Sequence, residues 1–115
     1  LMTGSELATA AAEGATPIIV ISDNGYYGTI RLHQEKAFPG RIAGTRLKNP
    51  DFAAWGRAFG ALGLTVTTPE EAAEAVDAAL AHDGPVVIHA KSSVEAISPF
   101  ATISGIRAAA ARAAE

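Results

Sequence analysis

The chain has 115 residues, of which 49% are hydrophobic, and a formal net charge of −3, so it has enough material for one domain with one core. Its acidic and basic residues are interspersed, which excludes the basic stripe of a nucleic-acid-binding surface. The absence of cysteine excludes disulfides, thiolate zinc sites and thiol catalysis. No apolar stretch is long enough to span a bilayer. We expect a cytoplasmic protein without a membrane partner, and because residue 1 is leucine, a piece of a longer chain.

The first two elements are predicted to be a helix and a buried strand. Residues 3–14, TGSELATAAAEG, begin with a capping box of Thr3 and Glu6 and end at Gly14. Pro17 then precedes the strand IIVIS, which is apolar on both faces. Such runs are typical of parallel sheets, so we expect this strand to be covered on both sides.

A short helix around residues 29–37 is predicted next, followed by a loop over residues 38–48. The loop sequence, FPGRIAGTRLK, contains glycines, a proline and basic side chains. It buries little apolar surface, so we expect it to be the internal segment that opens most easily. Its basic side chains could approach an anionic substrate, although a solvated loop is the simpler interpretation.

Two further helix–strand pairs and a last helix are predicted in the second half. Residues 49–60 form a helix with Asn49 as cap and Pro50 at its first position, and LGLTVTT follows as a strand. The clearest helix runs from Thr68 to Gly84, with a capping box of Thr68 and Glu71. We expect its inward face to carry Ala73, Val76 and Leu80. The strand PVVIHAK and the helix TISGIRAAAARAAE complete the chain.

This order of elements predicts an α/β fold. Helices and strands alternate as in a three-layer arrangement, a mostly parallel sheet with helices on both faces. Neither an internal repeat nor a low-complexity linker divides the sequence. We therefore predict a single domain over residues 1–115.

The stretch DNGYYG, residues 23–28, follows the first strand and is the candidate binding motif. In open α/β sheets, ligands bind beyond the carboxyl ends of the strands. Asn24 supplies an amide oxygen, Gly25 permits a sharp turn, and Gly28 permits close approach of a ligand. Oxygen ligands suit Mg²⁺ or Ca²⁺, and a helix beginning nearby would direct free N–H groups at an anion. On spacing alone, a simple turn between strand and helix is an equally good interpretation.

The motif resembles the second half of the thiamine diphosphate-binding motif of the acetolactate synthase and pyruvate decarboxylase superfamily. That motif opens with Gly-Asp-Gly and ends, after a helix and a strand, in Asn-Asn or Asp-Asn. Here LMTGSELATA resembles the helix and IIVISDNGYYGTI resembles the closing strand and turn. NPDFAAWGRAFGALG and PEEAAEAVDAALAHDGPVVIHAK are also similar to this family's diphosphate domain, in the same order.

The resemblance implies a set of cofactor residues. Mg²⁺ would be bound by the side chain of Asn24 and the carbonyl of Tyr26. The Asp of Gly-Asp-Gly has no counterpart, because family spacing puts it a few positions before Leu1. The cofactor-binding residues carried over are Asn24, Gly25, Tyr26, Tyr27, Gly28 and Thr29.

The implied function is that of a cofactor-anchoring domain in a Mg²⁺- and thiamine diphosphate-dependent carboligase or decarboxylase that acts on 2-oxo acids. The resemblance places the Glu that activates the cofactor on the pyrimidine-binding domain of a partner subunit, in a homodimer or homotetramer. We therefore expect no catalytic residue in this segment, and no activity from the segment alone. Two alternatives stay open: a naturally short subunit of a two-chain enzyme, and a non-enzymatic α/β binding module.

The histidines and hydroxyl residues are interpreted as structural. His33 follows the motif on a helix, His82 lies near a helix C-terminus, and His89 is expected to pack within the sheet. Their spacing does not match a metal site. The serines and threonines between residues 92 and 104 are typical of turns and caps, and they indicate no Ser-His-Asp set.

Overall fold

The computed structural model describes residues 4–113, which fold as two compact units. Unit 1 consists of the described residues up to Asp23 together with Asn49–Lys91. Unit 2 consists of Asn24–Lys48 and the described residues from Ser92 onward. The order of elements along the chain is the α-β-α-α-β-α-β-α order that the sequence predicts. The assignment of both units to one domain stays a prediction.

Unit 1 is built on a three-stranded parallel sheet. Its strands are β1 (Ile18–Asp23), β2 (Leu62–Val66) and β3 (Val86–Lys91), in the spatial order β1-β3-β2. The middle strand β3 is buried over its first four residues, because both of its edges are paired and both of its faces are covered. The predicted parallel α/β fold is confirmed.

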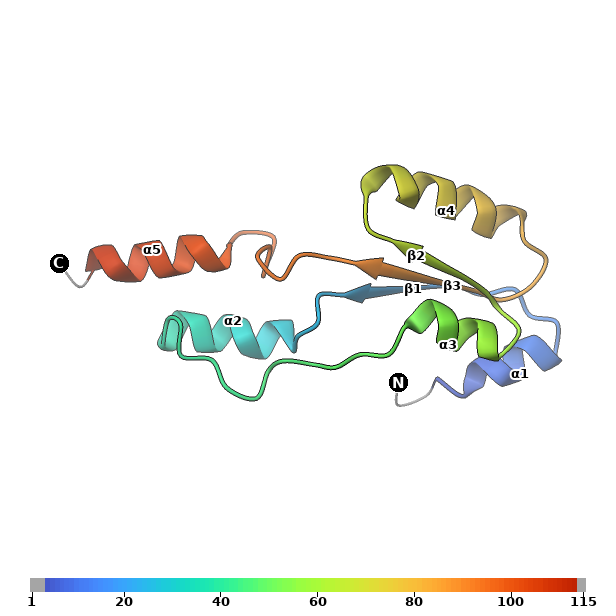
Figure 1. Ribbon diagram of the computed structural model, residues 1–115, viewed down its shortest axis with the longest axis horizontal. Helices are drawn as coiled ribbons and strands as arrows, with labels where there is room; N and C mark the ends of the chain where they lie inside the picture. The colour runs from blue at the N-terminus through green and yellow to red at the C-terminus, as the bar shows by residue number, and fades with distance from the viewer. Residues whose placement is uncertain (1–3, 114–115) are drawn as a thin grey trace. The chain divides into compact units, whose positions relative to one another are not determined.

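Helices cover both faces of this sheet. Helix α4 (Pro69–Ala81) packs on one face, and α1 (Glu6–Ala12) and α3 (Phe52–Ala58) pack on the other (Figure 1). The α4 side buries a cluster of Val66, Ala75, Ala79, Val86 and Ile88. The opposite side buries Leu7, Ala61 and Val87, with Trp55 and Phe59 partly buried against them.

The buried face of α4 and the number of covered faces of β1 differ from the predictions. Helix α4 turns Ala75 and Ala79 toward the sheet, whereas Val76 and Leu80 are 49% and 71% exposed. The small alanine side chains let the helix lie close to β2 and β3, and this packing decides the inward face against the larger residues. Strand β1 is covered on one face only within the described residues, since Val20 is 62% exposed. The expected cover on the second face of this strand is therefore absent within residues 4–113.

The predicted N-cap residue is correct for α4 and wrong for α3, where a different side chain provides the cap. The capping box of Thr68 and Glu71 at α4 is present. Helix α3 is capped by Asp51, whose side chain accepts a hydrogen bond from the Ala54 amide at 3.0 Å, and not by Asn49. Asp51 is correctly placed to reach an N–H group of the first turn, which frees Asn49 for another contact described below.

The start of α1 also differs from the prediction. The helix begins at Glu6, with Ser5 at the N-cap and no side-chain cap hydrogen bond. Glu6 therefore occupies the first helical position and not the third, which a capping box requires. The other half of the predicted box, Thr3, lies outside the described residues.

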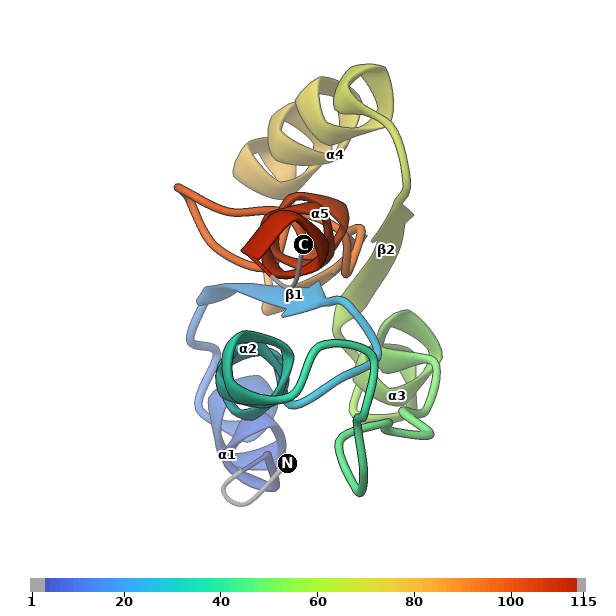
Figure 2. The ribbon, with the colours of Figure 1, turned by 90° about the vertical axis from the view of Figure 1, so that its left-hand side faces the viewer.

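Unit 2 contains α2 (Gly28–Ala37) and α5 (Ile103–Ala113), which lie side by side (Figures 1 and 2). The segment between α2 and α3 has no helix or strand, as predicted, but it is tied down. The side-chain amide of Gln34 donates to the Ala43 carbonyl at 2.8 Å and accepts from the Ala43 amide at 3.2 Å. Thr45 is only 3% exposed. These contacts argue against a loop that opens at little cost.

Among residues 4–113, none of the helices combines the length and hydrophobicity that crossing a bilayer requires.

Candidate cofactor-binding site

The motif after β1 forms a tight turn that presents the Asn24 side chain. Gly25 adopts φ +71°, a backbone conformation that favours glycine. The Oδ1 atom of Asn24 accepts a hydrogen bond from the Tyr26 amide at 3.0 Å, which closes a local turn. A Cβ atom on Gly28 would lie 3.1 Å from Nδ2 of Asn24. The absence of a side chain at Gly28 leaves room for the Asn24 amide, whereas the sequence suggested that it makes room for a ligand.

The residues on either side of this turn are paired with the segment that returns from α2. The Tyr27 amide donates to the Thr45 carbonyl and the Leu47 amide donates to the Gly25 carbonyl, each at 2.9 Å. These backbone hydrogen bonds hold the turn from its other side, so its geometry does not depend on its own residues alone.

Helix α2 begins directly after the turn, at Gly28. Its N-cap residue, Tyr27, makes no side-chain cap hydrogen bond, so the side chain of this residue leaves the first-turn N–H groups available. Uncapped N–H groups and the positive end of the helix dipole favour an anion at this position. Tyr26, Tyr27, Gly28, Thr29 and Ile30 line a hollow of about 330 Å³ there. Of the predicted residues, Tyr26 to Thr29 therefore line this hollow, and Asn24 and Gly25 belong to the turn that precedes it.

Asp23, at the end of β1, is held by partners within unit 1. Its Oδ1 accepts a hydrogen bond from Nδ2 of Asn49 at 2.7 Å, and its Oδ2 lies 2.9 Å from Nε2 of His89. Nδ1 of His89 accepts a hydrogen bond from the Phe52 amide at 3.2 Å. The proton of the neutral ring is therefore on Nε2, which donates to Asp23.

This network separates the roles of two neighbouring residues. Both carboxylate oxygens of Asp23 accept hydrogen bonds within the unit, so this side chain secures the end of the strand. The amide oxygen of Asn24 accepts a hydrogen bond from the Tyr26 amide and has a second lone pair. The prediction that His89 packs in the sheet is confirmed, because it is 1% exposed. Its link to Asp23 was missed, because only the alignment of β1 beside β3 places the two side chains together.

Unit 2 contains a buried charge cluster formed by side chains of α2 and α5. Glu35 is 0% exposed and accepts hydrogen bonds from Nε and Nη2 of Arg107, at 3.0 and 2.7 Å, and from the Gly40 amide at 2.9 Å. The Arg107 guanidinium lowers the pKa of the Glu35 carboxyl from 4.5 to about 2. Nη2 of Arg31 lies 3.5 Å from Oε1 of the same carboxylate. Sequence reasoning missed this cluster, because charged residues on a short helix are usually solvated.

The donor set at the turn fits part of a magnesium site. Asn24 and Tyr26 offer two neutral oxygens, and Mg²⁺ binds about six oxygen ligands in all, carboxylate, phosphate and water oxygens among them. Within residues 4–113, no group of three or more His, Cys, Asp or Glu residues could hold a metal ion. The turn therefore fits an ion that takes its other ligands from a diphosphate, from water and from a carboxylate elsewhere.

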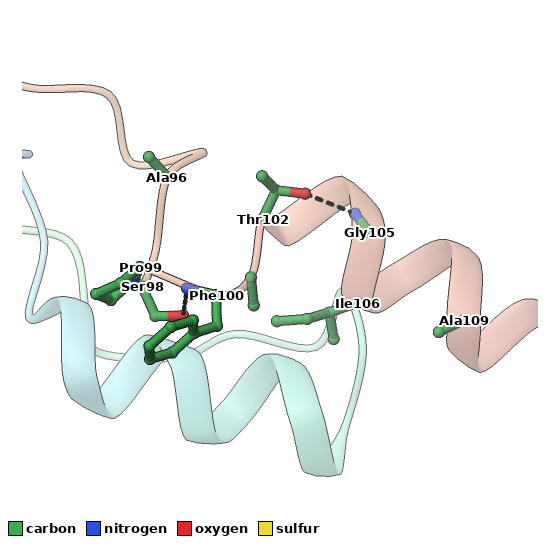
Figure 3. A pocket seen from close by; sticks show the side chains of 9 residues that line it. Ala96, Ser98, Pro99, Phe100, Thr102, Gly105, Ile106 and Ala109 are labelled. Carbon is green, nitrogen blue, oxygen red and sulfur yellow. Dashed lines mark hydrogen bonds between the residues drawn. The ribbon is translucent and has the colours of Figure 1, made fainter.

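A second hollow, of about 670 Å³, lies between α5 and the segment before it (Figure 3). Its lining includes Phe100 and Ile106 but no titratable residue. The hydroxyl groups in it serve the backbone, as predicted: Ser98 accepts from the Phe100 amide and Thr102 accepts from the Gly105 amide. This hollow offers nothing that would bind a diphosphate.

Comparison with known proteins decides the family. Residues 1–90 match the family model described as "Thiamine pyrophosphate enzyme, C-terminal TPP binding domain". The chain belongs to this family. Thiamine pyrophosphate and thiamine diphosphate are the same molecule, so the resemblance of the motif is confirmed, and the turn and the start of α2 lie inside the matched range.

The relatives of this thiamine diphosphate-binding domain include acetolactate synthases. The acetolactate synthase large subunit of Corynebacterium glutamicum is 38% identical over 93 residues, covering 76% of this chain and 15% of the relative. The acetolactate synthase isozyme 2 large subunit of Escherichia coli is 34% identical over 90 residues, covering 77% and 16%. Benzoylformate decarboxylase from Polynucleobacter necessarius is a structural neighbour with a TM-score of 0.68 and 29% identity, covering 77% of this chain and 17% of the neighbour.

This thiamine diphosphate-binding domain spans about one sixth of the length of those relatives. The matched range of the family ends at residue 90, so helix α5 with its Arg107 lies beyond it.

Proposed function

We propose that this chain anchors the diphosphate end of thiamine diphosphate through one Mg²⁺ ion. The side-chain oxygen of Asn24 and the backbone carbonyl of Tyr26 would bind the ion. The first-turn N–H groups of α2 would bind the diphosphate, with Gly28 and Thr29 at the start of that helix. Gly25 and Tyr27 shape the turn between the two.

The observation that carries this proposal is the division of roles at the end of β1. Asp23 is engaged by Asn49 and His89, so the carboxylate that would otherwise compete for the ion is already used. Asn24 is held in a fixed turn by the Tyr26 amide. A side chain held in this way loses little conformational freedom when it binds a metal, which favours Asn24 as the ligand.

The enzyme would be an acetolactate synthase-like carboligase or a decarboxylase that acts on 2-oxo acids. The names of the acetolactate synthase relatives and of the benzoylformate decarboxylase neighbour support this choice. When bound, thiamine diphosphate supplies the nucleophilic carbon and the electron sink for cleavage beside the carbonyl. The residues of this chain bind and orient the cofactor, and none of the described residues is proposed as a catalytic acid or base.

The proposal assigns the remaining parts to other polypeptide regions. The Glu that activates the cofactor would come from the pyrimidine-binding domain of a partner subunit, in a homodimer or homotetramer. A carboxylate from elsewhere would complete the metal ligands. The 115 residues alone would therefore be inactive.

The test is the replacement Asn24→Ala in the full-length protein that contains this chain. Thiamine diphosphate is titrated calorimetrically at limiting Mg²⁺, and we expect affinity to fall at least about tenfold, as metal sites respond to disturbance of even their outer partners. The fold should survive, because Asn24 serves the turn and not the core. Ser22→Ala, two residues earlier on the exposed side of β1, is the matched control. Unchanged affinity of the Asn24 variant would remove this residue from the site.

A further inference from the structure

Helix α5 carries an arginine that reaches the helix of the cofactor motif. Arg107 lies outside residues 1–90, the range that matches the family, yet it contacts Glu35, 72 positions earlier in the sequence. We propose that Arg107 is a positioning residue for the metal ligand Tyr26, acting through the buried charges of α2. This inference rests on the proposed function, because Tyr26 matters only if its carbonyl binds the ion.

The first link joins α5 to α2. Arg107 donates from Nε and Nη2 to the two separate oxygens of Glu35, at 3.0 and 2.7 Å. Such a bidentate contact fixes both the distance and the orientation of the carboxylate, which a single hydrogen bond does not. Glu35 is fully buried, whereas the Arg107 side chain is 45% exposed, so Arg107 covers the carboxylate on the side that faces solvent.

The second link joins Glu35 to Arg31, one turn earlier on α2. The Arg31 guanidinium lies 3.5 Å from the Glu35 carboxylate and stacks over the Tyr26 ring, with 4.2 Å between the guanidinium carbon and the ring centroid. Arg31 is only 7% exposed, and its Nε has no hydrogen-bond partner within the described part of the chain. The position of Arg31 therefore depends on a carboxylate on one side and an aromatic ring on the other.

The third link joins that ring to the proposed ligand. Tyr26 carries the carbonyl assigned to the ion, and its amide donates to Asn24, the other assigned ligand. A cation is attracted to an aromatic ring only while it stays close above the face of that ring. Movement of Arg31 thus changes the packing of Tyr26, and with it the geometry of both oxygens.

Loss of Arg107 would redistribute these contacts. The buried Glu35 carboxylate would keep the Gly40 amide and Arg31, which would then be its one charged partner in the described part of unit 2. A buried anion that loses one cation draws the remaining one closer or takes up a proton. In either case Arg31 leaves its place between Glu35 and Tyr26.

The test compares three variants of the full-length protein: Arg107→Gln, Arg107→Lys and Arg112→Gln. Arg112 is an exposed arginine in the last turn of the same helix and serves as the matched control. The first readout is the Mg²⁺ concentration that half-saturates thiamine diphosphate binding. The second is the electron paramagnetic resonance spectrum of Mn²⁺ in the loaded site, which reports the ligand geometry.

We expect Arg107→Gln to raise the half-saturating Mg²⁺ concentration roughly tenfold or more and to alter the Mn²⁺ spectrum. Arg107→Lys should raise the half-saturating Mg²⁺ concentration less than Arg107→Gln does, since an ammonium keeps the charge but cannot make the bidentate contact. Arg112→Gln should match the unmodified protein.

Three results would overturn the inference. One is an unchanged Mg²⁺ requirement in a folded Arg107→Gln variant, and another is a lower melting temperature with no change in either metal readout. The third applies if Arg107→Gln does not fold: an Arg107→Lys variant whose Mg²⁺ requirement equals that of the unmodified protein would then contradict the inference. An unmodified protein that binds no thiamine diphosphate at saturating Mg²⁺ would instead refute the proposed function, and the inference with it.

Discussion

Replacement of His89 by leucine tests the network at the end of β1. Leucine is similar in size to histidine, so the change removes hydrogen bonds while adding little cavity. The Phe52 amide loses its acceptor in a buried position, and an unsatisfied buried donor costs about 1–3 kcal/mol. Asp23 loses the donor from His89 but keeps the one from Asn49, at a further cost of about 1 kcal/mol. We expect unit 1 to be destabilised by about 3 kcal/mol.

Hydrogen exchange followed by mass spectrometry measures this effect locally, and in the full-length protein. A loss of about 3 kcal/mol corresponds to roughly 100-fold faster exchange of amides that open together. Peptides that contain Phe52 and β3 should show this acceleration. His33→Leu makes the same chemical change at an exposed position on α2, and we expect it to leave these peptides unchanged.

The reasoning would be refuted by His89→Leu exchange rates within a few-fold of those of the unmodified protein and of His33→Leu. That result would mean that water or an adjusted backbone satisfies the Phe52 amide without cost. It would also remove the argument that Asp23 is reserved for holding the strand.

The other predictions concern packing, acid sensitivity and the segment after α2. Gly63→Ala should destabilise the protein by about 3 kcal/mol in urea unfolding, because the new Cβ would lie 2.1 Å from the Ala53 carbonyl oxygen; unaltered stability would show that α3 can shift freely. Since the pKa of Glu35 is lowered from 4.5 to about 2 in the folded state, its contribution to stability is complete above pH 4.5 and is lost as the pH falls toward 2. Glu35→Gln should remove that part of the acid sensitivity, which acid titration of the melting temperature checks. The amides of Tyr27 and Leu47 should be protected from exchange even without cofactor, because both donate to backbone carbonyls; rapid exchange at both would restore the expectation of an easily opened loop.

The sequence by itself determined the features that depend on neighbouring residues. The capping box of α4 needs only Thr68 and Glu71, three positions apart, so its pattern is visible without a fold. The turn at Gly25 needs a positive φ that glycine adopts without strain, and the Asn-Gly pair announces it. Apolar runs and helical spacing likewise predict the order of the elements and the parallel sheet, because hydrophobic periodicity is a local property.

Only the tertiary structure decided which side chains meet across the fold. Asp23 and His89 are 66 positions apart, and Glu35 and Arg107 are 72 apart. No local pattern links such pairs, and a charged residue on a short helix is by default expected in water, where its ion has the lowest free energy. Glu35 departs from that default because Arg107, Arg31 and the Gly40 amide replace the lost water. The inward face of α4 was decided in the same way, since close approach to the sheet selects the small side chains of Ala75 and Ala79 over larger apolar ones.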